Sequence, residues 1–258
     1  MAKKRLIPKI LLQKGGYKNN QNVVVRTHKF SNPVQTGEVV SQAKIFQDQI
    51  ADELIILRID NEISKNELLD ISNNIANEIF MPLTIGGGID NLFFIEELLK
   101  NGADKVSINS SAIKNPNIIK EASYNFGVST VVASVDYKTN SSGESTVFSN
   151  NGKYDTKINL LEWIKKIENY GAGEILLCSI DNDGTRNGLD INTSKEVRNS
   201  VSIPVVISGG CGRGSHFVEG FLDTDVSGIS AGTFFALQDQ NFIQIRSHII
   251  NSGINIRN

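Results

Sequence analysis

The sequence predicts an α/β protein built as a single (βα)8 TIM barrel, on three observations. The chain has 258 residues, close to the ~250 residues typical of such a barrel. Short apolar runs rich in β-branched residues alternate with amphipathic segments, a pattern that predicts βαβ units and a parallel sheet. Segments of the first half of the chain also recur in the second half. A doubly wound open sheet is the alternative, but no GxGxxG follows the first strand.

The predicted elements alternate along the whole chain, which we expect to form one domain over residues 1–258. The strand-like runs are residues 5–12, 54–59, 82–85, 105–108, 130–136, 174–180, 203–207 and 228–231. The helix-like segments are residues 38–49, 65–80, 92–101, 116–126, 159–171, 192–200, 215–222 and 242–252. Residues 137–156, after the fifth strand, are rich in Asn, Ser and Gly and predict a hairpin or a mobile loop.

Composition excludes several classes of protein. Hydrophobic residues make up 40% and charged residues 21% of the chain, which excludes a disordered chain. The net charge of −2 gives no indication of nucleic-acid binding. Cys178 and Cys211 form no CxxC, and the three histidines lie far apart, so we expect neither disulfides nor a metal, nor any cofactor. No apolar run reaches the ~18 residues of a membrane span, and a cytoplasmic protein is expected.

Charge is distributed unevenly along the chain. The first acidic residue is Glu38, and the segment before it carries +8, which leaves −10 for the remainder. The basic residues of this segment are Lys3, Lys4, Arg5, Lys9, Lys14, Lys18, Arg26 and Lys29. The segment is either an ordinary solvated basic edge or a basic loop over a site for phosphorylated substrates.

The internal repeat predicts two equivalent phosphate sites. Pro82-Leu-Thr-Ile-Gly-Gly-Gly88 recurs as Pro204-Val-Val-Ile-Ser-Gly-Gly210, an offset of 122 residues, as expected for a duplicated half-barrel. Glycines directly after a buried strand let backbone N–H groups approach an anion. The first predicted cradle comprises Gly87, Gly88, Asn109 and Ser110, and the second comprises Gly209, Gly210, Gly212, Ala231 and Gly232. Tight turns and helix caps are the alternative roles of these glycines.

Two carboxylates are placed for catalysis at the carboxyl ends of strands, where barrel enzymes carry their active sites. Asp136 ends the fifth strand in Val-Ala-Ser-Val-Asp136, and Asp183 lies in Asp-Asn-Asp183-Gly-Thr after the sixth. A helix cap is the alternative role of Asp136, and Asp183 precedes a glycine as many turn residues do.

Four charged residues open strands at the opposite end of the predicted barrel. Arg5, Glu53, Lys105 and Glu174 open the first, second, fourth and sixth strands. Buried without partners they would be costly, so we expect them to pair across the barrel axis. They are either scattered surface charges or a salt-bridged gate in the floor.

These motifs together resemble HisF, the cyclase subunit of imidazole glycerol phosphate synthase, over nearly the whole chain. The resembling segments are Lys4-Arg-Leu-Ile-Pro8, Asp52-Glu-Leu54, Gly86-Gly-Gly-Ile89, Gly102-Ala-Asp-Lys-Val-Ser-Ile-Asn109, Gly171-Ala-Gly-Glu-Ile-Leu-Leu177, Ser179-Ile-Asp-Asn-Asp-Gly-Thr185 and Ser208-Gly-Gly-Cys-Gly212. The resemblance implies a (βα)8 barrel that takes ammonia from a HisH-like glutaminase docked at its floor. It implies that Arg5, Glu53, Lys105 and Glu174 form the family's ammonia gate and that Asp104 lies at the glutaminase interface. Asp136 and Asp183 match residues of the cyclase site, where a phosphorylated ribulosyl substrate is split.

The departures from the family pattern concern the barrel mouth. The family's first-strand Cys-Leu-Asp reads Lys9-Ile-Leu11, so Leu11 replaces the acid/base aspartate. Loss of an acid/base partner typically costs ~10²–10⁴ in rate. The family aspartate ending the second strand is Arg58, and the family lysine of the first loop is replaced by Arg26. Lys9 shares strand parity with Arg5, so we expect its side chain to point into the barrel towards Asp136.

Leucine at position 11 resembles a HisF-like branch that serves sugar amidation. We therefore expect a subunit that relays ammonia from a HisH-like glutaminase to a sugar amidotransferase, for acetamidino groups of surface glycans. The first alternative is a genuine cyclase of histidine biosynthesis in which another group replaces the aspartate. The second is a non-catalytic scaffold that activates the glutaminase.

Overall fold

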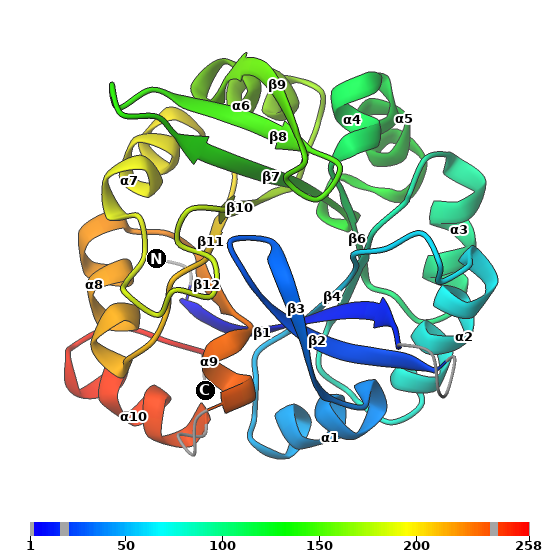
Figure 1. The fold of residues 1–258 in the computed structure, drawn as a ribbon, viewed down its shortest axis with the longest axis horizontal. Helices are drawn as coiled ribbons and strands as arrows, with labels where there is room; N and C mark the ends of the chain where they lie inside the picture. The colour runs from blue at the N-terminus through cyan, green and yellow to red at the C-terminus, as the bar shows by residue number, and fades with distance from the viewer. Residues whose placement is uncertain (1–2, 16–20, 238–241, 258) are drawn as a thin grey trace.

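The computed structural model describes residues 3–15, 21–237 and 242–257, which contain a closed parallel barrel (Figure 1). The barrel strands, in their order around the ring, are β1 (Arg5–Lys14), β4 (Leu54–Arg58), β5 (Leu83–Gly86), β6 (Lys105–Ile108), β7 (Val131–Thr139), β10 (Glu174–Ser179), β11 (Val205–Ser208) and β12 (Gly228–Ala231). The last strand pairs with the first, from Arg5 opposite Gly228 to Pro8 opposite Ala231, which closes the sheet. The predicted (βα)8 fold is therefore confirmed.

Helices surround the barrel and cover its outer face (Figure 1). The long ones are α1 (Val39–Asp48), α2 (Lys65–Ala76), α3 (Leu92–Lys100), α5 (Asn117–Phe126), α6 (Leu160–Asn169), α7 (Ile191–Ser200), α8 (Gly214–Thr224) and α10 (Phe242–Asn251). Several begin at a side chain that accepts a hydrogen bond from the first turn, as Ser64, Asn91 and Asn159 do. Short helices α4 (Ser110–Lys114) and α9 (Thr233–Leu237) follow β6 and β12, and a 3₁₀ turn η1 (Val128–Thr130) precedes β7.

Element boundaries differ slightly from the predicted ones. The helix predicted over residues 65–80 ends at Ala76, because Asn77 caps it and the following residues turn towards β5. The Gln47 side chain accepts hydrogen bonds from the backbone of Phe80 and Met81 in that turn. The strand predicted from residue 203 begins at Val205, after Pro204, which lacks the N–H that a sheet ladder requires.

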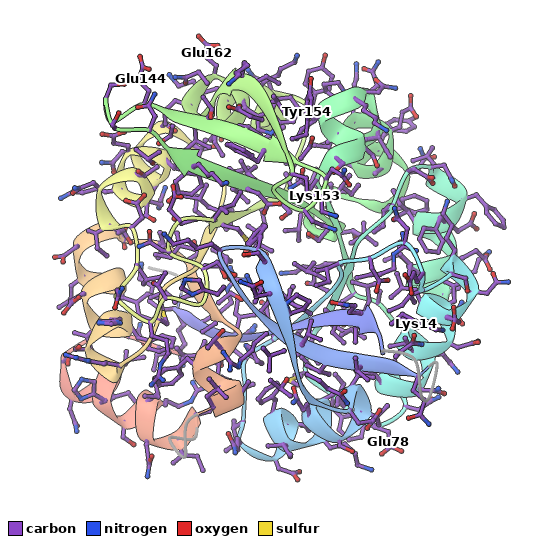
Figure 2. The ribbon with its side chains drawn as sticks, viewed as in Figure 1. Lys14, Glu78, Glu144, Lys153, Tyr154 and Glu162 are labelled. Carbon is purple, nitrogen blue, oxygen red and sulfur yellow. The ribbon has the colours of Figure 1, made fainter. Side chains whose placement is uncertain are left out.

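A β-hairpin that the sequence did not predict lies across the barrel mouth (Figure 1). Its strands are β2 (Asn22–His28), which pairs antiparallel with the extended end of β1, and β3 (Ser31–Gly37). The excursion after the fifth barrel strand forms a second hairpin, as one of the two predicted forms. It consists of β8 (Ser145–Ser149) and β9 (Tyr154–Asn159), and Figure 2 labels Lys153 and Tyr154 in it and Glu144 in the turn before β8.

Apolar side chains are buried in two layers. The larger core lies between the barrel strands and the surrounding helices. The smaller one fills the barrel interior with Ile7, Ile55, Val132, Leu176, Cys178 and Val206. It separates the two ends of the barrel, where the charged residues lie. Among the described residues, no helix is long and apolar enough to span a membrane.

Candidate functional site

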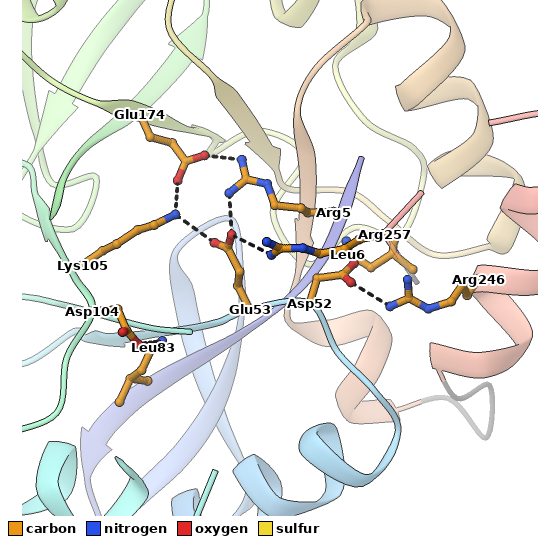
Figure 3. A network of polar contacts seen from close by, with 10 residues as sticks. All are labelled: Arg5, Leu6, Asp52, Glu53, Leu83, Asp104, Lys105, Glu174, Arg246 and Arg257. Atoms are coloured by element: carbon orange, nitrogen blue, oxygen red, sulfur yellow. Dashed lines mark hydrogen bonds and ion pairs between the residues drawn. The ribbon is translucent and has the colours of Figure 1, made fainter. Parts of the chain in front are cut away.

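The floor of the barrel holds a closed ring of four charges (Figure 3). The Arg5 guanidinium donates to Glu53 at 2.7 Å and to Glu174. The Lys105 ammonium donates to the same two carboxylates, at 3.1 Å to Glu53 and 2.9 Å to Glu174. Each cation therefore contacts both anions, and the predicted pairing across the axis is what the structure shows. We call these four residues the charged gate.

Burial makes the charged groups of the gate depend on one another. The side chains of Glu53 and Glu174 are only 6% and 8% exposed. Burial alone would raise the pKa of Glu174, but Arg5 and then Lys105 outweigh it, so its pKa is lowered. The carboxylates likewise raise the pKa of Arg5 against its own desolvation. The charged forms of Arg5 and Glu174 therefore stabilise each other.

Further charges hold the floor around the gate (Figure 3). Arg257, near the end of the chain, comes within 3.9 Å of Glu53. Asp52 accepts from the Leu6 backbone at 2.7 Å and from Arg246 at 3.0 Å, which fixes the loop that carries Glu53. The exposed Asp104 accepts from the Leu83 backbone at 2.8 Å. Asp104 directly precedes Lys105 in the chain, so it lies at the floor beside the charged gate. The resemblance to HisF places this residue at the glutaminase interface.

Small hydroxyl side chains line the barrel between its two ends, and sequence reasoning missed them. Thr84, Ser107, Ser134 and Ser230 are buried. Each alternates in its strand with residues of the outer core, so each faces the interior. The hydroxyls of Ser107 and Ser230 have no hydrogen-bond partner in the described part of the chain. Strand parity could have revealed them, since Ser107 is two residues after Lys105 and Ser134 two before Asp136.

The mouth of the barrel brings one amine and two carboxylates together. Lys9 is buried and interacts electrostatically with Asp136 and Asp183, so its predicted inward orientation is confirmed. Asp136 accepts a hydrogen bond from the Asn109 amide at 2.8 Å. Asp183 accepts from the Thr27 hydroxyl at 2.6 Å and from the Phe30 backbone at 3.4 Å, and both donors belong to the hairpin across the mouth.

Burial sets the proton affinities at the mouth. Desolvation raises the pKa of Asp136 to about 7; Lys9 opposes this rise and Asp183 adds to it. Desolvation of Lys9 would lower its pKa, but the facing Cys178, Asp183 and Asp136 outweigh it and raise the pKa. Lys9 is therefore an ammonium at neutral pH. Asp136 exchanges a proton in the range where a general acid/base works best.

Leu11 lies beside this centre and brings no acid to it. It lines a pocket together with Lys9, Arg26, Asp183 and Gly232. The Arg26 Nε is buried without a partner among the described residues. Lys9 and Leu11 both reach this pocket from β1, so the mouth holds an amine and an apolar side chain where the resemblance expects an aspartate.

The two glycine cradles lie at the carboxyl ends of β5 and β11, which face each other across the barrel with three strands between them on either side. Gly87 and Gly88 follow β5 with φ of 102° and 71°, and Gly209 and Gly210 follow β11 with φ of 104° and 108°. An added Cβ at Gly210 would come within 1.9 Å of the Gly188 carbonyl oxygen, so this turn requires glycine.

The remaining cradle residues complete both sites. Asn109 and Ser110 join the first cradle from the end of β6 and the start of α4. The second cradle opens into a pocket with Lys9 and Asp183, lined also by Gly209, Gly210, Ala231 and Gly232. The repeated motifs therefore meet the acid/base centre at one rim. Among the described residues, no three His, Cys, Asp or Glu side chains gather as metal ligands.

Comparison with known proteins agrees with this arrangement. The sequence model of the family described as histidine biosynthesis protein matches residues 5–240. A Prochlorococcus marinus (strain MIT 9313) protein, provisionally named imidazole glycerol phosphate synthase subunit hisF2, is 41% identical over all of this chain and 99% of its own length. The imidazole glycerol phosphate synthase subunit HisF of Hydrogenobaculum sp. (strain Y04AAS1) is 38% identical over the full length of both chains.

Proposed function

The chain belongs to the HisF family of histidine biosynthesis proteins, and from this premise we propose that it is the cyclase subunit of an imidazole glycerol phosphate synthase. In this proposal a HisH-like glutaminase docks at the floor near Asp104 and supplies ammonia through the charged gate. The ammonia reacts at the mouth with a phosphorylated ribulosyl substrate held by the two glycine cradles. The observation that carries the proposal is that the two ends of one barrel hold the charged gate and the Lys9–Asp136–Asp183 centre.

The mouth chemistry requires proton transfer in both directions. When ammonia condenses with a carbonyl group, the oxygen must gain protons to leave as water, and the nitrogen must lose them. Asp136, with a pKa of about 7, can accept a proton and return it. The Lys9 ammonium supplies a positive charge and N–H donors beside it, which stabilise negative charge on the carbonyl oxygen. Lys9 thus supplies a polar group to a site in which Leu11 replaces the family's aspartate.

Sugar amidation is the second candidate, and one observation favours it. Leu11 lines the mouth pocket where the family pattern has an acid/base aspartate. A subunit that only relays ammonia to a separate sugar amidotransferase would not need that aspartate. The names of the two relatives refer to imidazole glycerol phosphate synthase and not to sugar amidation, so they favour the histidine-biosynthesis function. A scaffold that only activates a glutaminase is favoured by no observation.

The deciding experiment measures turnover of the ribulosyl substrate with ammonium as nitrogen donor. We expect measurable formation of imidazole glycerol phosphate, and a loss of about 10²-fold or more in Asp136→Asn and in Lys9→Met. Lys120→Met, which removes an exposed charge on α5, is the control and should leave the rate unchanged. Leu11→Asp tests whether the rest of the pocket supports the family chemistry, and it should raise the rate.

The opposite outcome would support sugar amidation. The chain would then form no product with ammonium, while the glutaminase and a sugar amidotransferase together would transfer labelled glutamine nitrogen to a sugar only in its presence. Stimulation of the glutaminase without either product would indicate a scaffold.

A further inference from the structure

Arg58 is a half-buried cation without an ion-pair partner in the described part of the chain. It ends β4 at the rim of the mouth. Its Nη1 donates to the Ile63 carbonyl at 2.6 Å, and its Nε is buried with no partner. A guanidinium carries five N–H donors and cannot release its charge at physiological pH, so an unpaired one at a binding rim is costly. Burial lowers the pKa of Arg58, in keeping with that cost.

The two carboxylates that act electrostatically on Arg58 already have other hydrogen-bond partners. Asp60 accepts hydrogen bonds from the backbone N–H groups of Lys14 at 2.6 Å and of Glu62 and Ile63 at 3.2 Å. Asp90 pairs with Lys65 at 2.6 Å. They act on Arg58 electrostatically, but neither forms an ion pair with it within 4.0 Å. Apart from the bond of Nη1 to the Ile63 carbonyl, the donors of the guanidinium therefore have no protein acceptor within the described ranges.

The first glycine cradle is shaped around this side chain. A Cβ at Gly88 would lie 1.6 Å from Arg58 Nη2 and 2.7 Å from its Cζ. A Cβ at Gly87 would lie 2.2 Å from the Arg58 carbonyl oxygen. Glycine at position 88 therefore leaves room for the guanidinium, and glycine at position 87 leaves room for the Arg58 backbone. The guanidinium consequently lies against the loop whose backbone is placed to approach an anion.

We propose that Arg58 is a phosphate ligand of the first glycine cradle. The planar guanidinium can present two N–H groups to two oxygens of a phosphate monoester, and the charge of the phosphate would neutralise its own. The proposal rests on the proposed function, because it assigns one phosphate of the same substrate to this cradle. It adds Arg58, which lies outside the repeated glycine motifs, to the residues of the first cradle. The second cradle has Arg26 and Lys9 on its side of the mouth and does not depend on Arg58.

The test is a calorimetric titration of the full-length chain with inorganic phosphate. Arg58→Gln should weaken one class of phosphate sites by about tenfold or more, as expected for charged hydrogen bonds, and leave the other class unchanged. Arg58→Lys keeps the charge but loses the two-pronged contact, so it should weaken binding less. Lys120→Gln removes a distant exposed charge and should have no effect. Circular dichroism checks that the variants fold.

Two results would overturn the proposal. One is phosphate binding to Arg58→Gln or, should that variant not fold, to Arg58→Lys with the affinity of the unaltered chain at both sites. The other is binding of acetate, measured in parallel, that depends on Arg58 while phosphate binding does not. Because these measurements require no turnover, their failure leaves the cyclase assay to decide the proposed function separately.

Discussion

Lys9 is the residue whose charge governs the acid/base centre. Its ammonium lowers the pKa of Asp136, which desolvation raises to about 7. Without that ammonium the carboxylate would lose its favourable charge neighbour and hold its proton to higher pH. The amine thus keeps Asp136 in the range where it can exchange protons at neutral pH.

Lys9→Met should therefore move the titration of Asp136 upward by about one pH unit or more. The measurement is a ¹³C NMR titration of the Asp136 carboxyl, assigned by the signal that disappears in Asp136→Asn. Lys120→Met serves as the charge control. An unchanged midpoint in Lys9→Met would mean that the ammonium does not act on Asp136, and would remove its role in the proposed mechanism.

At the scale of residues, strand parity was the informative signal. It placed Lys9 inside the barrel, because Lys9 is separated from Arg5 by two full alternations. It could not give the pKa of Asp136, since that value arises from burial among residues of several strands. It also could not show that the Arg58 guanidinium packs against the glycine loop after β5, because α2 and β5 lie between them in the sequence.

The hairpin of β2 and β3 is the element that completes the mouth. Thr27 donates to the Asp183 carboxylate at 2.6 Å, and the Lys29 backbone donates to the Asp183 carbonyl at 2.8 Å. Phe30 packs against the apolar cluster inside the barrel. The hairpin is therefore hydrogen-bonded to Asp183, which it covers. We expect the stability of the hairpin and the position of Asp183 to depend on each other.

Thr27→Val should loosen this hairpin while keeping the shape of the side chain. A hydrogen bond to a charged group contributes about 1.5–3 kcal/mol, so amide hydrogen exchange in residues 22–37 should accelerate about tenfold or more. Hydrogen-exchange mass spectrometry measures the effect. Ser31→Ala removes an exposed hydroxyl of the same hairpin, which donates to the His28 carbonyl, and should change exchange little. Equal exchange in both variants would show that Asp183 does not hold the hairpin.

At the scale of elements, periodicity predicted the barrel strands and long helices, and it failed at the hairpin. The eight predicted strands and the helices between them carry apolar residues whose spacing matches a buried ladder or helix face. Residues 22–37 contain Asn, His and Pro among the apolar ones, and Lys29, Phe30 and Asn32 have positive φ. Their pairing is imposed by β1 and by Asp183, so it depends on contacts distant in sequence.

The whole molecule combines a floor and a mouth that differ in how closely they follow the family pattern. The charged gate retains all four residues matched to the family, whereas Leu11 and Arg58 depart from it at the mouth. Ring closure of the barrel brings Arg5 to Glu174, residues far apart in sequence. The sequence alone predicted the pairing from strand starts. It did not predict the contact of Arg257 with the gate, because the isolated β-bridge between Lys4 and Ile256 that places Arg257 has no strand-like run to indicate it.

Removing one charged side chain from this ring should lower the free energy of unfolding more than removing one cation and one anion together. Arg5→Met leaves two buried carboxylates facing mainly Lys105, and such an uncompensated charge costs about 3–5 kcal/mol. Arg5→Met/Glu174→Met leaves the Lys105–Glu53 ion pair, whose two charges cancel, and should lose less free energy of unfolding. Urea unfolding measures both. A double variant that is less stable than Arg5→Met would contradict the view that charge balance holds the floor together.

The same two variants test whether ammonia crosses the floor. If the gate admits ammonia from a docked glutaminase, disturbing it should lower turnover with glutamine and glutaminase by about tenfold or more. Turnover with a high concentration of ammonium should change little, because ammonia from solvent can reach the mouth directly. Lys44→Met, which removes an exposed charge paired with Glu78 outside the ring, is the control. Equal losses with both nitrogen donors would place the defect in the mouth or the fold, and unchanged turnover with glutamine would show that the ring is structural and not a passage.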